Sequence, residues 1–114
     1  MHATSRPSKL LVYRHMLETI EAMVPLLEAI GGRSRDLASQ LERAASSVTL
    51  NLAESCGARR GNRVALRHVA LGSLYEVMGA LDTAVALRYV ARGECSDVQR
   101  ELARLASMVE ALVG

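Results

Sequence analysis

The sequence predicts an all-α protein, an antiparallel up-down-up-down four-helix bundle. Half of its 114 residues are Ala, Leu, Arg, Glu or Lys, a composition typical of long helices. Apolar residues recur at steps of three and four in four successive segments, and short glycine-rich or polar breaks separate these segments. Short connections between helices favour antiparallel neighbours. The length fits a single domain over residues 1–114.

The first predicted helix ends at Gly31 and Gly32, residues typical of a helix C-terminus. Its apolar stripe is Leu10, Tyr13, Leu17, Ile20, Val24 and Leu27, whose alternation of three and four is close to a heptad. Met16, Met23 and Ile30 widen the stripe, so this helix is expected to bury more than one face.

The second and third helices are expected to start at polar caps, Ser34 or Asp36 for the second and Asn62 for the third. The second stripe is Leu37, Leu41, Ala44, Val48 and Leu52, and the third is Leu66, Val69 or Ala70, Ser73, Val77, Leu81 and Ala84. Gly72 and Gly79 lie inside the third helix. They indicate either close packing against a neighbour or glycines that the helix merely tolerates.

Ser96 and Gln99 have the spacing of a capping box and predict the start of the fourth helix. Its stripe is Val98, Leu102, Leu105, Val109 and Leu112. In this topology Cys56 and Cys95 lie at opposite ends of the bundle, so an intrachain disulfide is excluded. We therefore expect a cytoplasmic protein with reduced thiols. No uncharged run approaches the roughly 20 residues that cross a bilayer, so no membrane partner is expected.

Several classes of function lack their required residues. With no Phe, no Trp and three Tyr, the chain does not fit modules that stack bases on aromatic side chains. No Glu is followed three positions later by His, as the metal sites of di-iron bundles require, so we predict no metal and no cofactor. No glycine-rich loop follows a strand, and no nucleophile has a base placed by a motif.

Arginines near the second turn are the strongest functional signal. The cluster is Arg59, Arg60, Arg63 and Arg67, and no acidic residue occurs between Glu54 and Glu76 to neutralise it. The last three share one helix face, and Arg6 and Lys9 should lie at the same end of the bundle. Because the arginine fork binds phosphate oxygens in pairs, the cluster predicts a nucleic-acid contact. The alternative is a solvated end of the bundle in an arginine-rich chain.

Two further sets of residues allow competing interpretations. Four residues separate Arg63 from His68, a spacing that resembles the ribonuclease motif of HEPN domains; the competing interpretation is a surface or interface histidine. Asn51, Glu54 and Glu76 are expected to form a buried polar network that fixes register or oligomeric state, rather than an acid–base site.

Three runs of sequence resemble a known family. They are Gln40–Val48 (QLERAASSV), Asn51–Glu54 (NLAE) and Ala70–Glu76 (ALGSLYE). They are similar to the four-helix-bundle proteins encoded in intervening sequences of bacterial large-subunit ribosomal RNA genes, where the pattern is Gln-Leu-x-Arg-Ala-x-x-Ser-Ile, Asn-Ile-Ala-Glu-Gly and Ala-x-Gly-Ser-x-x-Glu. Two departures are Ser55 for the usual glycine and Glu42 at a position that is often basic.

The resemblance implies a ring-forming bundle, commonly a homopentamer, with no known enzymatic activity. A related branch, the accessory proteins of diversity-generating retroelements, consists of basic pentameric barrels that bind nucleic acid and partner a reverse transcriptase. We therefore expect a non-enzymatic homo-oligomer that contacts RNA or DNA, with a reverse transcriptase or another protein as a candidate partner. The alternatives are a purely structural scaffold for a protein partner and a HEPN-like ribonuclease using Arg63 and His68.

Overall fold

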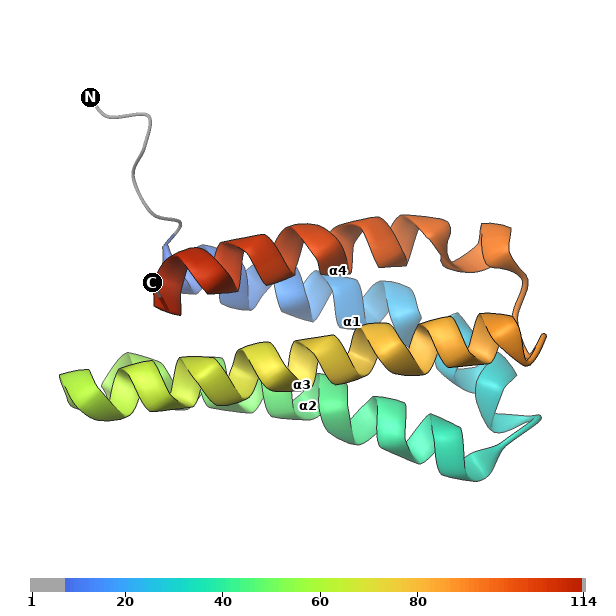
Figure 1. Ribbon diagram of the computed structural model, residues 1–114, viewed down its shortest axis with the longest axis horizontal. Coiled ribbons are helices and arrows are strands. Elements are labelled where there is room, and N and C mark those ends of the chain that lie inside the picture. The colour runs from blue at the N-terminus through green and yellow to red at the C-terminus, as the bar shows by residue number, and fades with distance from the viewer. Residues whose placement is uncertain (1–7, 114) are drawn as a thin grey trace.

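The computed structural model describes residues 8–113, which form four helices in an antiparallel bundle (Figure 1). The helices are α1 (Lys9–Gly31), α2 (Arg35–Gly57), α3 (Arg60–Ala86) and α4 (Arg92–Val113). Each runs antiparallel to the next, so α1 and α3 begin at one end of the bundle and α2 and α4 begin at the other. The predicted fold class and helix order are confirmed.

The core lies between all four helices, and α1 and α3 occupy diagonal corners, each packed on α2 and α4. The α2–α3 contact is the most extensive, because small residues such as Ala44 and Ala45 let the two backbones approach. Across this contact the Ser47 and Ser73 hydroxyls lie 2.7 Å apart. Both cysteines are free thiols, Cys56 exposed and Cys95 buried.

The face by which α1 enters the core differs from the predicted stripe. Its buried residues are Val12, Met16, Thr19, Met23, Leu26 and Ile30. Half of the predicted stripe is exposed, since Leu10, Leu17 and Val24 are 56%, 40% and 45% exposed. The other half, Tyr13, Ile20 and Leu27, packs partly against the core. The residues expected to widen the stripe, Met16, Met23 and Ile30, are fully buried, so the expectation that α1 buries more than one face is confirmed. The buried set and the predicted stripe both alternate steps of four and three, so heptad spacing alone does not identify the inner one. We call the buried set the inner seam of α1, and the predicted stripe the outer seam.

Two of the predicted helix starts are wrong. Helix α3 begins before Asn62, with Arg59 at the N-cap position and no side-chain hydrogen bond to close its first turn. Helix α4 begins at Arg92 because Glu94 Oε1 accepts a hydrogen bond from the Ala91 N–H (2.8 Å), so the helix starts about one turn earlier than Ser96. Ser34 does cap α2, since its hydroxyl accepts from the Leu37 N–H (3.1 Å).

The glycines inside α3 do not provide close packing within the described chain. Gly72 and Gly79 are exposed, and no atom lies within 4 Å of the position that a Cβ would take at either residue. Helix α3 is also long and apolar enough, by length and composition alone, to cross a membrane. In the bundle 33% of this apolar window is buried, and the buried stripe packs on α2 and α4.

Candidate nucleic-acid interface

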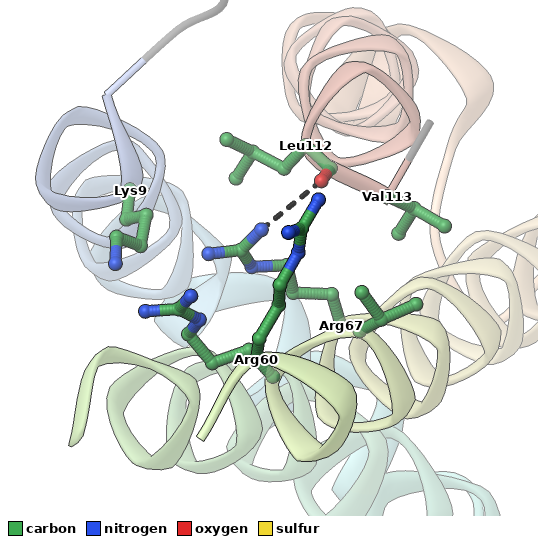
Figure 2. A pocket seen from close by; sticks show the side chains of 7 residues that line it. Lys9, Arg60, Arg67, Leu112 and Val113 are labelled. Carbon is green, nitrogen blue, oxygen red and sulfur yellow. Dashed lines mark hydrogen bonds between the residues drawn. The ribbon is translucent and has the colours of Figure 1, made fainter. Parts of the chain in front are cut away.

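A hollow of about 370 Å³ opens at the end of the bundle where α1 and α3 begin and α4 ends. It is lined by Lys9, Arg60, Arg63, Val64, Arg67, Leu112 and Val113. Figure 2 shows the side chains of Lys9, Arg60 and Arg67 extending into the space between the three helices. We call this site the basic hollow. The sequence predicted that three of its arginines share a face and that Lys9 joins them; Arg6 lies outside the described residues.

Arg67 is held in place by the end of α4. Its Nη1 donates a hydrogen bond to the Leu112 carbonyl oxygen (3.1 Å), and its Nε is buried without a hydrogen-bond partner (Figure 2). A buried donor without a partner costs free energy, so the site has hydrogen-bonding capacity that the described chain does not use. The Leu112 carbonyl could not be identified from a motif, because only the topology brings the end of α4 to this place.

The charges around the basic hollow oppose the helix dipoles. Helices α1 and α3 have no acidic residue in their first turns, and Lys9 and Arg60 are their first residues. The positive end of a helix dipole favours anions, so cations there are unfavourable by some tenths of a kcal/mol each, up to about 1 kcal/mol. Both helices thus start with a cation and no acidic residue, against the preference of the helix dipole. Such departures from favourable local interactions concentrate at functional sites.

The cations of the basic hollow have no carboxylate partners among residues 8–113. The ion pairs of the described chain are His15–Glu101, Arg100–Asp97 and Arg104–Glu101, all elsewhere. Arg60 is exposed, whereas Arg63 and Arg67 are half-buried. Arg59 is exposed and belongs to the same cluster, but it does not line the basic hollow. Within residues 8–113, the site therefore offers concentrated positive charge without a neighbouring carboxylate to neutralise it.

Comparison with known proteins shows the family of the chain. The family model described as 23S rRNA-intervening sequence protein matches residues 8–111. The chain belongs to this family. A protein of unknown function from the S23 ribosomal protein family of Bacteroides thetaiotaomicron has the same fold, with a TM-score of 0.83 and 17% identity over 90% of this chain and 97% of that chain. Among curated proteins, none matches the chain.

Two of the three runs that resemble the family pattern, Gln40–Val48 and Ala70–Glu76, meet in the structure of this intervening-sequence protein. A second hollow, of about 360 Å³, lies between α2 and α3 and is lined by Gln40, Arg43, Ala44, Ser47, Ser73 and Glu76. Two runs far apart in the chain thus build a single polar groove. The pattern therefore marks the α2–α3 contact and not the basic hollow.

The buried polar network predicted for Asn51, Glu54 and Glu76 is wrong. Both carboxylates lie on exposed positions, where water solvates their charge at no cost. The half-buried Asn51 instead donates to the Ser47 carbonyl oxygen (2.8 Å) and to its hydroxyl (3.1 Å). Ser47 then meets Ser73, so the network that joins α2 to α3 consists of neutral groups.

Arg63 and His68 do not meet in a common site. Arg63 lines the basic hollow, whereas His68 is an exposed residue of α3 outside that lining. Five positions turn an α-helix by about 500°, which leaves the two side chains roughly 140° apart around the axis. Among residues 8–113, no three His, Cys, Asp or Glu side chains gather closely enough to hold a metal ion.

Proposed function

We propose that this intervening-sequence protein is a non-enzymatic, self-assembling bundle that binds the phosphates of RNA or DNA through its basic end and acts as an accessory or assembly factor. The observation that carries the proposal is the basic hollow, where four cations converge without a carboxylate partner in the described chain. Arg60, Arg63 and Arg67 inside the basic hollow and Arg59 beside it supply the phosphate contacts.

Contact with phosphates gives a reason for the cations at the starts of α1 and α3, which helix stability alone does not favour. An anion at the starts of α1 and α3 would complement the dipoles of both helices. Guanidinium groups bind phosphate oxygens with paired hydrogen bonds, and the Arg67 side chain is already ordered by the Leu112 carbonyl. None of these contacts reads a base edge, so we expect affinity with little sequence preference.

A salt titration tests this proposal. Binding of a labelled single-stranded RNA, and of DNA of the same sequence, is measured by fluorescence anisotropy between about 50 and 200 mM salt. Four phosphate contacts predict a slope of about −3 for log K against log salt, because each contact to a single strand contributes about −0.7. Replacing all four arginines by alanine should abolish binding.

A matched pair of variants separates the basic hollow from net charge. Arg60→Ala/Arg63→Ala removes two charges from the basic hollow, whereas Arg88→Ala/Arg92→Ala removes two from a hollow at the opposite end of the bundle. We expect the first variant to lower the salt slope by about 1.4 and the second to leave it unchanged. Equal losses in the two variants would reject the basic end as the binding site.

Self-assembly is proposed through the outer seam of α1, with a second copy of the chain as occupant. The seam keeps heptad spacing over six apolar residues, and this spacing is what allows one helix to pack along another over several turns. Within the described chain Tyr13, Ile20 and Leu27 of this seam pack partly against the core, whereas Leu10, Leu17 and Val24 are exposed. These three exposed residues supply the surface for a helix of another copy. The number five follows from the resemblance described above.

The assembly proposal is tested by measuring mass in solution. We expect a homopentamer for the unmodified chain. Leu17→Glu/Val24→Glu places charges on two exposed positions of the outer seam, so it should give monomers that remain helical. Glu21→Gln on the same helix is the control and should leave the mass unchanged. A monomeric unmodified chain would reject self-assembly, and an assembled chain without nucleic-acid affinity would favour the scaffold function.

A further inference from the structure

We infer that the basic hollow binds a phosphomonoester, the phosphorylated end of a nucleic-acid strand or a mononucleotide, in preference to an internal phosphodiester. This inference rests on the proposed function, because the same arginines serve both. The observation that leads to it is the shape of the site. Three helices, α1, α3 and α4, contribute walls to one hollow, and four cationic side chains line it.

The small volume of the basic hollow favours the end of a strand over its middle. An internal phosphate has a nucleotide on each side, so a strand must both enter and leave its binding site. A terminal phosphate needs one opening only. The volume of about 370 Å³ lies at the lower end of the range for small-ligand pockets, roughly 300–1,000 Å³. The basic hollow therefore fits one nucleotide unit.

The charges of the ligand and of the site also favour a phosphomonoester over a phosphodiester. A phosphomonoester carries about −1.5 to −2 charges at neutral pH and three terminal oxygens, whereas a phosphodiester carries one charge. Lys9, Arg60, Arg63 and Arg67 converge on this volume without a carboxylate partner among residues 8–113. The monoester neutralises more of this charge, and the buried Nε of Arg67 provides one further donor.

The remaining lining residues fit the nucleoside. Val64 and Val113 add apolar residues to the lining of the basic hollow, suited to contact with a sugar or a base without reading its edge. The Leu112 side chain is buried in the core, and this residue meets Arg67 through its backbone carbonyl. Arg59 lies in the same cluster but outside the lining, so it can contact the backbone further along the strand. Because Arg59 lies outside the lining, its substitution serves as the control for charge loss near the hollow but not within it.

The experiment compares oligonucleotides that differ only at their ends. Single-stranded RNA with a 5′-phosphate, a 3′-phosphate or hydroxyls at both ends is titrated at one salt concentration and followed by anisotropy. A phosphorylated end should bind about tenfold more tightly, which is the size expected for added charged hydrogen bonds. Adenosine monophosphate should compete with it. Arg60→Ala and Arg63→Ala should remove the preference, whereas Arg59→Ala should weaken all oligonucleotides equally and keep it.

Each outcome decides between the two proposals. Oligonucleotides that bind without preferring a phosphorylated end overturn this inference and leave the proposed function intact. A preference that survives both lining variants, with the fold verified by thermal unfolding, also overturns it. If no oligonucleotide binds but adenosine monophosphate raises the melting temperature of the unmodified chain and not of Arg63→Ala, the proposed function fails and the phosphomonoester site is supported. If neither binds, both fail.

Discussion

The two ends of the bundle are both rich in arginine, yet only one of them has carboxylates in its first helical turns. At the far end, where α2 and α4 begin, Asp36 and Glu94 lie in the first helical turns and complement the dipoles. At the basic end, where α1 and α3 begin, Lys9 and Arg60 occupy the first turns and no acid is present. All four helices begin with a cationic residue, Arg35 and Arg92 at the far end included. Only the far end adds a carboxylate in each first turn that complements the helix dipole, so the basic end is the one left open to an anion.

Arginine at the far end has structural roles. Arg33 Nη1 donates to the Arg88 carbonyl oxygen at 3.5 Å, and its guanidinium lies 5.2 Å from the centre of the Tyr89 ring. These contacts hold the connection between α1 and α2 against the connection between α3 and α4. The number of arginines therefore does not identify a binding site; the groups that surround them do.

The largest expected difference between the two ends is the reactivity of their cysteines. Cys56 is exposed in the last turn of α2, at the basic end, whereas Cys95 is fully buried in α4 near the far end. Burial, together with the nearby Glu94 and Asp82 carboxylates, raises the pKa of the Cys95 thiol and keeps it protonated. A thiol reagent should label Cys56 on the order of a thousandfold faster, because Cys95 reacts only after opening.

The measurement is mass spectrometry of the labelled chain over time, with Cys56→Ser as the control that should lose the fast phase. Comparable labelling rates in the folded protein would mean that the far end opens readily, and would contradict the contrast between a closed far end and an open basic end.

The next effect concerns the missing cap of α3. Arg59 occupies the N-cap position without a side-chain hydrogen bond. Arg59→Asp should stabilise the fold by about 1 kcal/mol, since aspartate can accept from the first turn and complements the helix dipole. The same change should weaken nucleic-acid binding about tenfold, because one phosphate contact is replaced by repulsion.

Urea unfolding and anisotropy measure these two effects on one variant. A loss of affinity without a gain in stability would show that the cation is not unfavourable for α3. Arg59→Gln, which removes the charge without offering an acidic cap, is the control and should change stability less.

The smallest effect is expected at the far end, where the backbone has one unfavourable residue. Arg88 has φ of 63°, in the left-handed region, and ends α3 in a Schellman motif: its N–H bonds the Val85 carbonyl (3.0 Å), and the Tyr89 N–H bonds the Ala84 carbonyl (2.9 Å). Arg88→Gly should raise the unfolding free energy by about 1 kcal/mol. Thermal unfolding measures the gain, and nucleic-acid affinity should stay unchanged; a fall in affinity would mean that the far end also binds.

The sequence was sufficient for the helices, their order and the gathering of arginines at one end, because apolar periodicity and short turns determine these features. It could not identify the inner face of α1, since Met16 and Leu17 belong to seams with the same heptad spacing. It also placed Glu54 and Glu76 in a buried network, although nothing in one sequence distinguishes a polar residue at the edge of a contact from one inside it. The sequence could not predict that the Leu112 carbonyl accepts a hydrogen bond from Arg67, because every residue has a backbone carbonyl and only the fold brings this one to Arg67.

The position of Lys9 and Val113 beside the same hollow has a practical consequence. A purification tag or fluorescent label joined directly to Lys9 or Val113 would lie beside the anion site, where a polyhistidine stretch or an acidic linker would compete with the ligand. The connection between α3 and α4, on the other side of the molecule, is the better place to attach a probe.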